Sequence, residues 1–219
     1  MRKLLLLRPE PGLSASAERA RSMGLDAIAC PLFRVEPVEW FAPDARCYDG
    51  LLLTSANAAR HGGTALEGLR QLPVHAVGAA TAAAAREAGF RVESIGSGNA
   101  AEFLAGLPAS LKLLHLAGED RREVADSRLD VRIVYRSLPI EKPELPSLDG
   151  LVVAVHSPRA GARLAELADR RSTAAIAAIS AAAAEVCGSG WERIEVAERP
   201  DDPSLLALAA MLCHTSPPA

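Results

Sequence analysis

Short apolar runs alternate with alanine-rich stretches along this chain. The runs GLLL from Gly50, VHAV from Val74 and VESI from Val92 have the length of buried strands. The stretches between the runs carry helix signals, and Gly24 and Gly89 follow two of them where a left-handed C-terminal cap is favoured. Strands that alternate with helices are typical of a parallel sheet with crossover helices. The pattern therefore predicts a doubly wound α/β fold in units of about 100 residues.

An internal repeat predicts two such units. The segment that begins at Asp49 can be laid over the segment that begins at Leu151 with an almost constant shift of 102 residues. A long repeat of this kind indicates two copies of one supersecondary unit. The shift is supported by Ser55 with Ser157, Val77 with Ile179, and Phe103 with Leu205.

Two proline-bearing segments interrupt the pattern at equivalent places. Residues 31–45 and residues 136–149 each contain three prolines and have little helical periodicity. Such segments are typical of linkers. Two linkers predict two crossings between domains, so that the first strands and the last part of the chain share one domain and the middle of the chain forms the other.

Composition and charge narrow the class of protein. The chain has 219 residues, of which 49% are hydrophobic and 23% charged, as in a folded globular protein, so a disordered chain is excluded. The net charge is -3 and the aromatic fraction is 4%. We do not expect nucleic acid as a partner, because neither a basic field nor a set of stacking side chains is present.

The start of the chain and its cysteines indicate a cytoplasmic protein. The first apolar run ends at Arg8 and Pro9, too early for a signal peptide, and no apolar span has the length of a membrane helix. Association with a membrane is therefore not expected. The four cysteines lie far apart without CxxC spacing, which favours reduced, buried thiols over disulfides or a zinc site.

Polar residues at the predicted strand ends are the candidate binding site. In a parallel sheet, ligands bind beyond the carboxyl ends of the strands, where helices begin and present free N–H groups. Hydroxyl-bearing, small and basic residues at these ends suit an anion, particularly a carboxylate. Alternatively, the serines and the threonine of the helix starts only cap helices, and the arginines are ordinary surface residues. The candidates are Arg8, Thr54, Ser55, Asn57, Gly78, Thr81, Gly118, Arg121, Ser157, Arg159 and Ser180.

Tyr135 is the candidate catalytic residue. We expect it to end the last strand before the second linker. A phenol is protonated at neutral pH and can act as a general acid for a poor oxygen leaving group. A half-buried linker aromatic is the alternative interpretation. Tyr48, the other tyrosine, is expected to start a strand and to be structural.

Other familiar sites are not supported, so neither a cofactor nor a metal is expected. GSGNAA from Gly96 imitates a dinucleotide-binding loop, but the helix expected over residues 100–107 is too short and the second copy lacks the motif. No histidine has a partner at the spacing of a metal site on a helix, and no G-x-S-x-G motif is present.

The order and spacing of the motifs resemble the uroporphyrinogen-III synthase family, which closes the linear tetrapyrrole hydroxymethylbilane. The resemblance extends along nearly the whole chain. It rests on LLLLRPEPG, DGLLLTSANAAR, HAVGAATAAAAREAGF, GSGNAAEFL, HLAGEDRR, IVYRS, VVAVHSPRAGARL and VAERPDDPSLLALA.

The resemblance implies two flavodoxin-like domains from an internal duplication, joined by a two-stranded linker, with the active site in the cleft between them. It places residues 1–34 and 137–219 in the first domain and residues 38–134 in the second, with linkers at about 32–42 and 134–146. It also implies a monomer whose only partner is a polycarboxylate tetrapyrrole, without cofactor or metal.

The resemblance also implies a reaction. Loss of the terminal hydroxyl gives a cation, and attack by the substituted carbon of the last ring gives a spiro intermediate from which that ring is released inverted. Tyr135 matches the linker tyrosine that assists departure of the hydroxyl. Thr81 matches the threonine of VGxxTA, Ser55 and Ser157 match serines that meet substrate carboxylates, and Arg8 stands in the first loop.

One departure and two alternative functions remain. The second copy has Ser180 and Ala183 where the family commonly has a glycine and a threonine, so a contact from that threonine is absent or is supplied by Ser180. One alternative function is a two-lobed binding or sensor module for an anionic metabolite, without catalysis. The other is a nucleotide-dependent oxidoreductase that uses GSGNAA.

Overall fold

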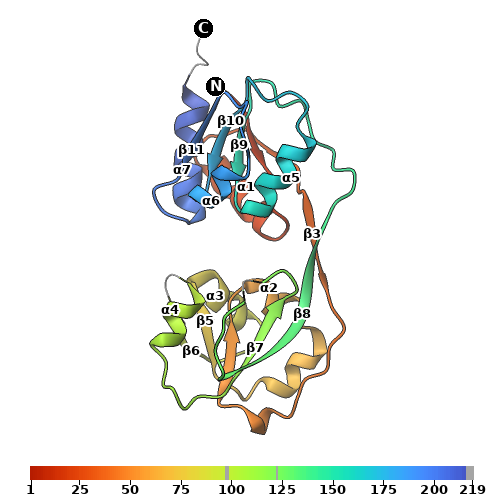
Figure 1. The fold of residues 1–219 in the computed structure, drawn as a ribbon, viewed down its shortest axis with the longest axis vertical. Helices are drawn as coiled ribbons and strands as arrows, with labels where there is room; N and C mark the ends of the chain where they lie inside the picture. Colours follow the sequence, from red (N-terminus) through yellow and green to blue (C-terminus); the bar gives the residue numbers. More distant parts are fainter. Residues whose placement is uncertain (97–98, 122, 216–219) are drawn as a thin grey trace. The chain divides into compact units, whose positions relative to one another are not determined.

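The computed structural model of this protein describes residues 1–96, 99–121 and 123–215. Its contacts divide the chain into two units, each with its own sheet (Figure 1). Unit 1 consists of Met1–Arg34 and the segment that begins at Pro139, and unit 2 consists of Val35–Leu138. The chain therefore passes from unit 1 to unit 2 once and returns once.

Unit 1 is built on a five-stranded sheet within the described residues, in the order β11-β10-β9-β1-β2, and all four strand pairs are parallel. When the strands of the unit are numbered along the chain, this is the 2-1-3-4-5 order of flavodoxin-like folds. The predicted parallel α/β architecture is confirmed. The elements are β1 (Leu4–Leu6), α1 (Gly12–Ser22), β2 (Ala27–Ala29), β9 (Val152–Val155), α5 (Pro158–Leu167), β10 (Ala175–Ala178), α6 (Ala181–Glu185), β11 (Arg193–Val196) and α7 (Asp202–His214).

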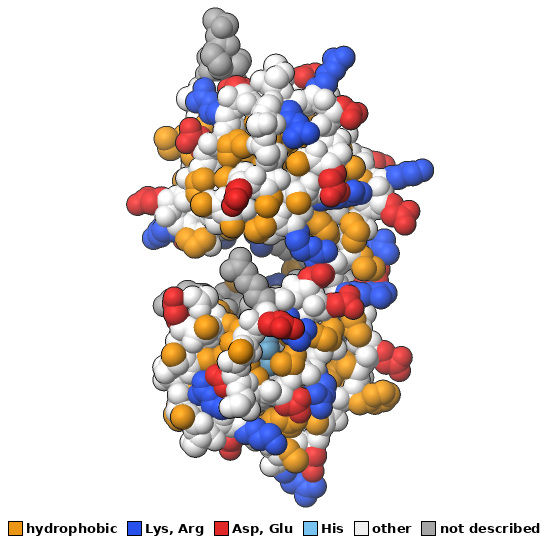
Figure 2. All heavy atoms as spheres, in the orientation of Figure 1, with side chains coloured by type: hydrophobic (Ala, Val, Ile, Leu, Met, Phe, Trp, Pro, Cys, Tyr) orange, Lys and Arg blue, Asp and Glu red, His pale blue; other side chains and the backbone are white. Residues whose placement is uncertain are grey.

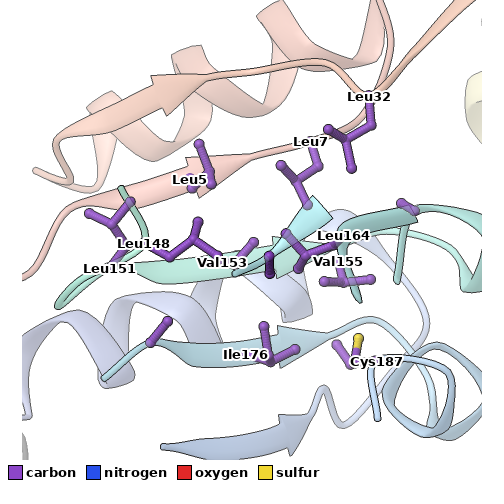
Figure 3. Packing of buried hydrophobic residues seen from close by; sticks show 14 of the residues in the cluster. Leu5, Leu7, Leu32, Leu148, Leu151, Val153, Val155, Leu164, Ile176 and Cys187 are labelled. Carbon is purple, nitrogen blue, oxygen red and sulfur yellow. The ribbon is translucent and has the colours of Figure 1, made fainter. Parts of the chain in front are cut away.

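The central strands of unit 1 are buried on both faces. Leu5 and Val153 point into a buried apolar cluster to which α5 and α6 contribute. Figure 3 shows residues of this cluster, with Leu5 and Val153 labelled. Leu4 and Val152 point into a second cluster, to which α1 and α7 contribute. Successive side chains of a strand point to opposite faces, so a strand covered on both sides must be apolar at every position. This requirement explains the unbroken run of leucines at the start of the chain.

Unit 2 has a six-stranded sheet within the described residues, in the order β3-β8-β7-β4-β5-β6. The order β8-β7-β4-β5-β6 corresponds to β2-β1-β9-β10-β11 of unit 1, but the pair β7 and β8 comes last in the chain of unit 2. The elements are β3 (Phe33–Pro37), η1 (Ala45–Cys47), β4 (Gly50–Leu53), α2 (Ala56–His61), η2 (Gly63–Leu69), β5 (Val74–Val77), α3 (Ala79–Glu87), β6 (Val92–Gly96), α4 (Ala100–Ala105), β7 (Leu113–Gly118) and β8 (Leu129–Pro139).

The two faces of the unit 2 sheet are covered differently. Leu51 and Leu53 belong to a large cluster with residues of α2, η2 and α3, whereas Leu52 packs on the opposite face with residues of α4 in a small cluster. His75 and His115 are the register partners of Leu52 in the neighbouring strands, so they share its face, and both are buried. The thinly covered face therefore contains polar groups.

Strand β8 extends past the end of β7 and pairs with β3. The Val38 N–H donates to the Val134 carbonyl at 3.0 Å, and the Ile140 N–H donates to the Leu32 carbonyl at 2.9 Å, which is an antiparallel pattern. Tyr135 therefore lies within β8, and the expectation that it ends a strand is wrong. The reason is that pairing with β3 continues the strand beyond the point at which its pairing with β7 stops.

No helix in the described ranges has the length and apolar character required to cross a bilayer.

Replacing Leu5 with Ala should lower the free energy of unfolding of unit 1 by about 2–5 kcal/mol, because it leaves a cavity at a fully buried position of a central strand. The two tryptophans allow unit 1 to be observed alone, since Trp191 packs in the Leu5 cluster and Trp40 packs against the core of unit 2. Urea unfolding followed by fluorescence in a Trp40→Phe background measures the change. The exposed Met211→Ala variant is the control, and an equal loss in both variants would contradict the packing described.

Candidate functional site

Each sheet reverses its strand order between two central strands, β1 and β9 in unit 1 and β4 and β7 in unit 2. The loops that follow two such strands lead away in opposite directions and leave a crevice at the carboxyl edge, where open α/β sheets bind ligands. Several predicted site residues lie at or just after the carboxyl ends of these four strands: Arg8, Thr54, Ser55, Gly118, Ser157 and Arg159. The topology therefore supports the carboxyl edges as the place to search for a site.

Unit 2 has a cavity of about 550 Å³ at its reversal point. A cavity of this size suits a small-molecule ligand or a part of a larger one. The cavity brings together five of the predicted residues with His115, Asn99 and Glu123, and its lining also includes the apolar residues Val77, Ala100, Ala101 and Val124. The five predicted residues are Thr54, Ser55, Gly118, Arg121 and Tyr135.

His115 is a site residue that the sequence analysis missed. Its Nε2 lies 3.0 Å from the Thr54 Oγ1, in a hydrogen bond whose donor depends on the tautomer of the ring. Burial, together with the nearby charge of Arg121, lowers the pKa of His115 to about 4, so the ring is neutral at neutral pH. The signal for it was a single polar residue within the apolar run LLHLAG. The cavity thus contains a neutral pair, Thr54 and His115, together with the basic side chain of Arg121 and the acidic side chain of Glu123.

Tyr135 enters this cavity because β8 is irregular there. Ala117 is paired with Ile133, but Gly118 is paired with Tyr135, so one residue of β8 is left over. A bulge of this kind redirects the side chains that follow it. The Glu119 N–H donates to the Tyr135 carbonyl at 3.0 Å, and the His61 ring lies 6.4 Å from the Tyr135 ring, centroid to centroid. The phenol is half-buried and lines the cavity.

All three serines of the predicted site cap helices. The hydroxyl of Ser55 accepts from the Asn57 N–H at 3.2 Å, that of Ser157 from the Ala160 N–H at 3.2 Å, and that of Ser180 from the Ala183 N–H at 3.3 Å. Asn57 thus takes part through its backbone, in the first turn of α2. Since a hydroxyl oxygen that accepts one bond keeps its own proton for a second partner, capping does not prevent these serines from binding an anion.

The expectation that Thr81 caps a helix is wrong. Gly78 is the N-cap of α3, with a φ of 90°, a conformation that favours glycine. Thr81 lies one turn further on, within α3, and its side chain is buried. The helix begins earlier because Gly78 turns the chain directly at the end of β5, so the alanines before Thr81 are already helical.

In unit 1 the reversal point is occupied by a cluster around Asp202, at the start of α7. This carboxylate accepts hydrogen bonds from Arg8 at 3.2 Å, from Ser16 at 2.6 Å and from His156 at 2.8 Å, and it pairs with Arg19. Burial alone would raise the pKa of Asp202, but the hydrogen bonds from His156 and Ser16 lower it to about 2. Arg8, a predicted binding residue, is therefore held by a carboxylate of the protein itself.

The remaining predicted features are less informative. The Arg159 guanidinium lies over the ring of Phe33, 4.7 Å from its centroid.

In GSGNAA, Ser97 and Gly98 lie outside the described residues, and the Asn99 side chain caps α4 by accepting from the Glu102 N–H at 2.9 Å. Helix α4 ends at Ala105, so it is even shorter than expected. The described part of the chain contains no cluster of three or more histidine, cysteine, aspartate or glutamate side chains that could hold a metal.

Comparisons with known proteins give one family. The model of the family described as uroporphyrinogen-III synthase HemD matches residues 14–207. The crystal structure of uroporphyrinogen-III synthetase from Helicobacter pylori is similar with a TM-score of 0.67 and 15% identity, over 97% of this chain and 100% of that chain. A mutant uroporphyrinogen III synthase from the extremely thermophilic bacterium Thermus thermophilus has a TM-score of 0.53 and 18% identity, over 96% of this chain and 98% of that chain. No curated protein sequence matches this chain.

The Asp202→Asn variant should lose stability in a way that depends on pH. Because the pKa of Asp202 is lowered from 3.8 to about 2 on folding, its contribution to stability is present above about pH 4 and is lost as the pH falls towards 2. The difference in the free energy of unfolding between wild type and Asp202→Asn should therefore be larger at about pH 7 than at about pH 3, as measured by urea unfolding. Glu185→Gln, an exposed position in α6, is the control and should show no such dependence. An equal difference at both pH values would contradict the role of the carboxylate.

Proposed function

The chain belongs to the uroporphyrinogen-III synthase family, and on this premise we propose that it converts hydroxymethylbilane into uroporphyrinogen III, with loss of water, ring closure and inversion of the last ring, ring D. The observation that carries the proposal is the match of the family model to residues 14–207, most of the 219 residues. The alternative of a binding module without catalysis is not favoured, since the family is one of synthases.

We propose that Tyr135 is the general acid. Its phenol lines the unit 2 cavity, where it can donate a proton to the departing hydroxyl of the substrate so that water leaves. The neutral state of His115 supports this assignment, because a histidine that stays unprotonated cannot supply this proton at neutral pH. The cavity therefore brings the Tyr135 phenol together with a basic group, Arg121, that suits the carboxylates of the substrate.

We propose that the other predicted residues hold the carboxylates of the substrate. In unit 2 these are Thr54, Ser55, Asn57, Gly78, Thr81, Gly118 and Arg121, and in unit 1 they are Arg8, Ser157, Arg159 and Ser180. Ser55 and Ser157 are the N-caps of helices that follow two corresponding strands, β4 and β9. This correspondence supports equivalent roles for the two serines in the two units. Binding by several hydroxyls, backbone groups and arginines would act mainly through positioning of the substrate.

The correspondence of the strand orders also supports the duplication that the resemblance implies. We propose that the two units arose by duplication, since five strands of the unit 2 sheet have the same spatial order as the five strands of the unit 1 sheet. We also propose that the substrate binds in a cleft between the units, as the resemblance implies. We further propose a cytoplasmic monomer. The buried free thiols of Cys30, Cys187 and Cys213 support a reducing compartment.

The proposed function predicts the isomer that the protein forms. Incubation with freshly generated hydroxymethylbilane, followed by oxidation and separation of the isomers, should give the type III product. Spontaneous closure gives the uninverted type I isomer, so a reaction without protein is the control. Exclusive type I product in the presence of the protein would overturn the proposal.

Replacing Tyr135 with Phe should lower kcat by about 100- to 10,000-fold, the usual contribution of a general acid, while KM changes little. The matched control is Tyr48→Phe, because Tyr48 is buried away from the cavity and its hydroxyl donates to Asp130. Both variants are measured in the isomer assay, with far-UV circular dichroism to verify folding. Unchanged turnover in Tyr135→Phe would remove Tyr135 from the acid role.

A further inference from the structure

Gly118 leaves the space that the Tyr135 ring occupies. A Cβ atom placed on Gly118 would lie 2.6 Å from Cζ, 2.7 Å from Cε2 and 2.8 Å from the hydroxyl oxygen of Tyr135. Carbon atoms in van der Waals contact stay about 3.5–4.0 Å apart, so a side chain at position 118 and the present position of the ring exclude each other.

The backbone does not require glycine at this position. The φ angle of Gly118 lies outside the positive range, in contrast to Gly78, so an alanine could adopt the local conformation. The nearest atoms that a side chain at this position would meet belong to the Tyr135 ring, so a side chain here requires the ring to move. Gly118 is also the last residue of β7, next to the reversal point and in the lining of the cavity.

The backbone of Tyr135 cannot move away without breaking other interactions. The Tyr135 carbonyl accepts from the Glu119 N–H, and its neighbour Val134 is fully buried in the core of unit 2. The ring itself packs against that core, with the His61 ring beside it. A group added at Gly118 would therefore be accommodated mainly by rotation of the phenol, and rotation moves its hydroxyl relative to the cavity.

We propose that Gly118 is a positioning residue. Because it has no side chain, the Tyr135 ring can lie against it, which places the Tyr135 hydroxyl where the leaving hydroxyl of the substrate binds. The proposal rests on the proposed role of Tyr135 as the acid. It assigns to Gly118 a role through Tyr135, in addition to any contact of its backbone with the substrate. The pairing of β7 with β8 agrees with this role, because the bulge brings Tyr135 directly opposite Gly118, the residue of β7 that has no side chain.

The Gly118→Ala variant should reduce kcat by about 10- to 100-fold, since a displacement of about 1 Å can cost two orders of magnitude in rate. The matched control is Gly68→Ala, because a Cβ atom at exposed Gly68 meets nothing within 4 Å. In a Tyr135→Phe background, Gly118→Ala should have no further effect on kcat, because the proton donor is already absent. A full additional loss in that background would assign Gly118 a direct substrate contact and overturn the proposal.

A second readout does not depend on activity. The chain has two tyrosines, so tyrosine labelled with ¹³C at Cζ alone gives two NMR signals, which the Tyr135→Phe variant assigns. Gly118→Ala should shift the Tyr135 signal and leave the Tyr48 signal in place. A Tyr135 signal that does not move would overturn the positioning role. If the signal moves while turnover is unchanged, positioning of the ring stands but the acid role of Tyr135, and with it this proposal, fails.

Thermal unfolding tests the proposal even if the Gly118→Ala variant is too unstable for kinetic measurements. The substitution should lower Tm in the wild-type background and have little effect on Tm in a Tyr135→Ala background, where the added methyl group has space. An equal decrease of Tm in both backgrounds would show that the ring is not what excludes the side chain, and the proposal would be wrong.

Discussion

The central strands of both parallel sheets are buried on both faces, and this burial determines where polar side chains can lie. A strand between two layers must be apolar at nearly every position, as β1 and β9 are in unit 1. Polar side chains are then confined to the strand ends, where the chain turns into helices and backbone N–H groups are free. The candidate site lies at the carboxyl edges because these edges are where the fold tolerates hydroxyls and charges.

His115 in unit 2 is an exception to this rule, whereas unit 1 has its charged cluster at the sheet edge. His115 is a polar residue inside a strand, and the structure accommodates it because its face of the unit 2 sheet has only a small apolar cluster and because Thr54 provides a partner. Burial and Arg121 keep its ring uncharged. In unit 1 the corresponding edge is organised by Asp202, which is ionised because His156, Ser16 and two arginines stabilise its charge.

The charges of the protein agree with local recognition of an anionic substrate. The net charge is only -3, and Figure 2 shows acidic and basic side chains interspersed over the visible face. Long-range attraction of a polycarboxylate is therefore weak, and binding would depend on a few arginines and on hydroxyls at helix starts. Several such contacts would together position the substrate, which fits a reaction in which the shape of the bound chain determines the product.

Hydrophobic periodicity, turn residues and motif order are local in the chain, so they were enough to predict the parallel α/β class, the residues at most strand ends and the family. Prediction from the sequence failed where contacts between distant segments determine the bounds of an element. The length of β8 depends on its pairing with β3, and the start of α3 depends on the turn at Gly78. Only the tertiary structure joined Thr54 to His115, Arg8 to Asp202 and Gly118 to Tyr135, since these contacts follow from which strands become neighbours and in which register.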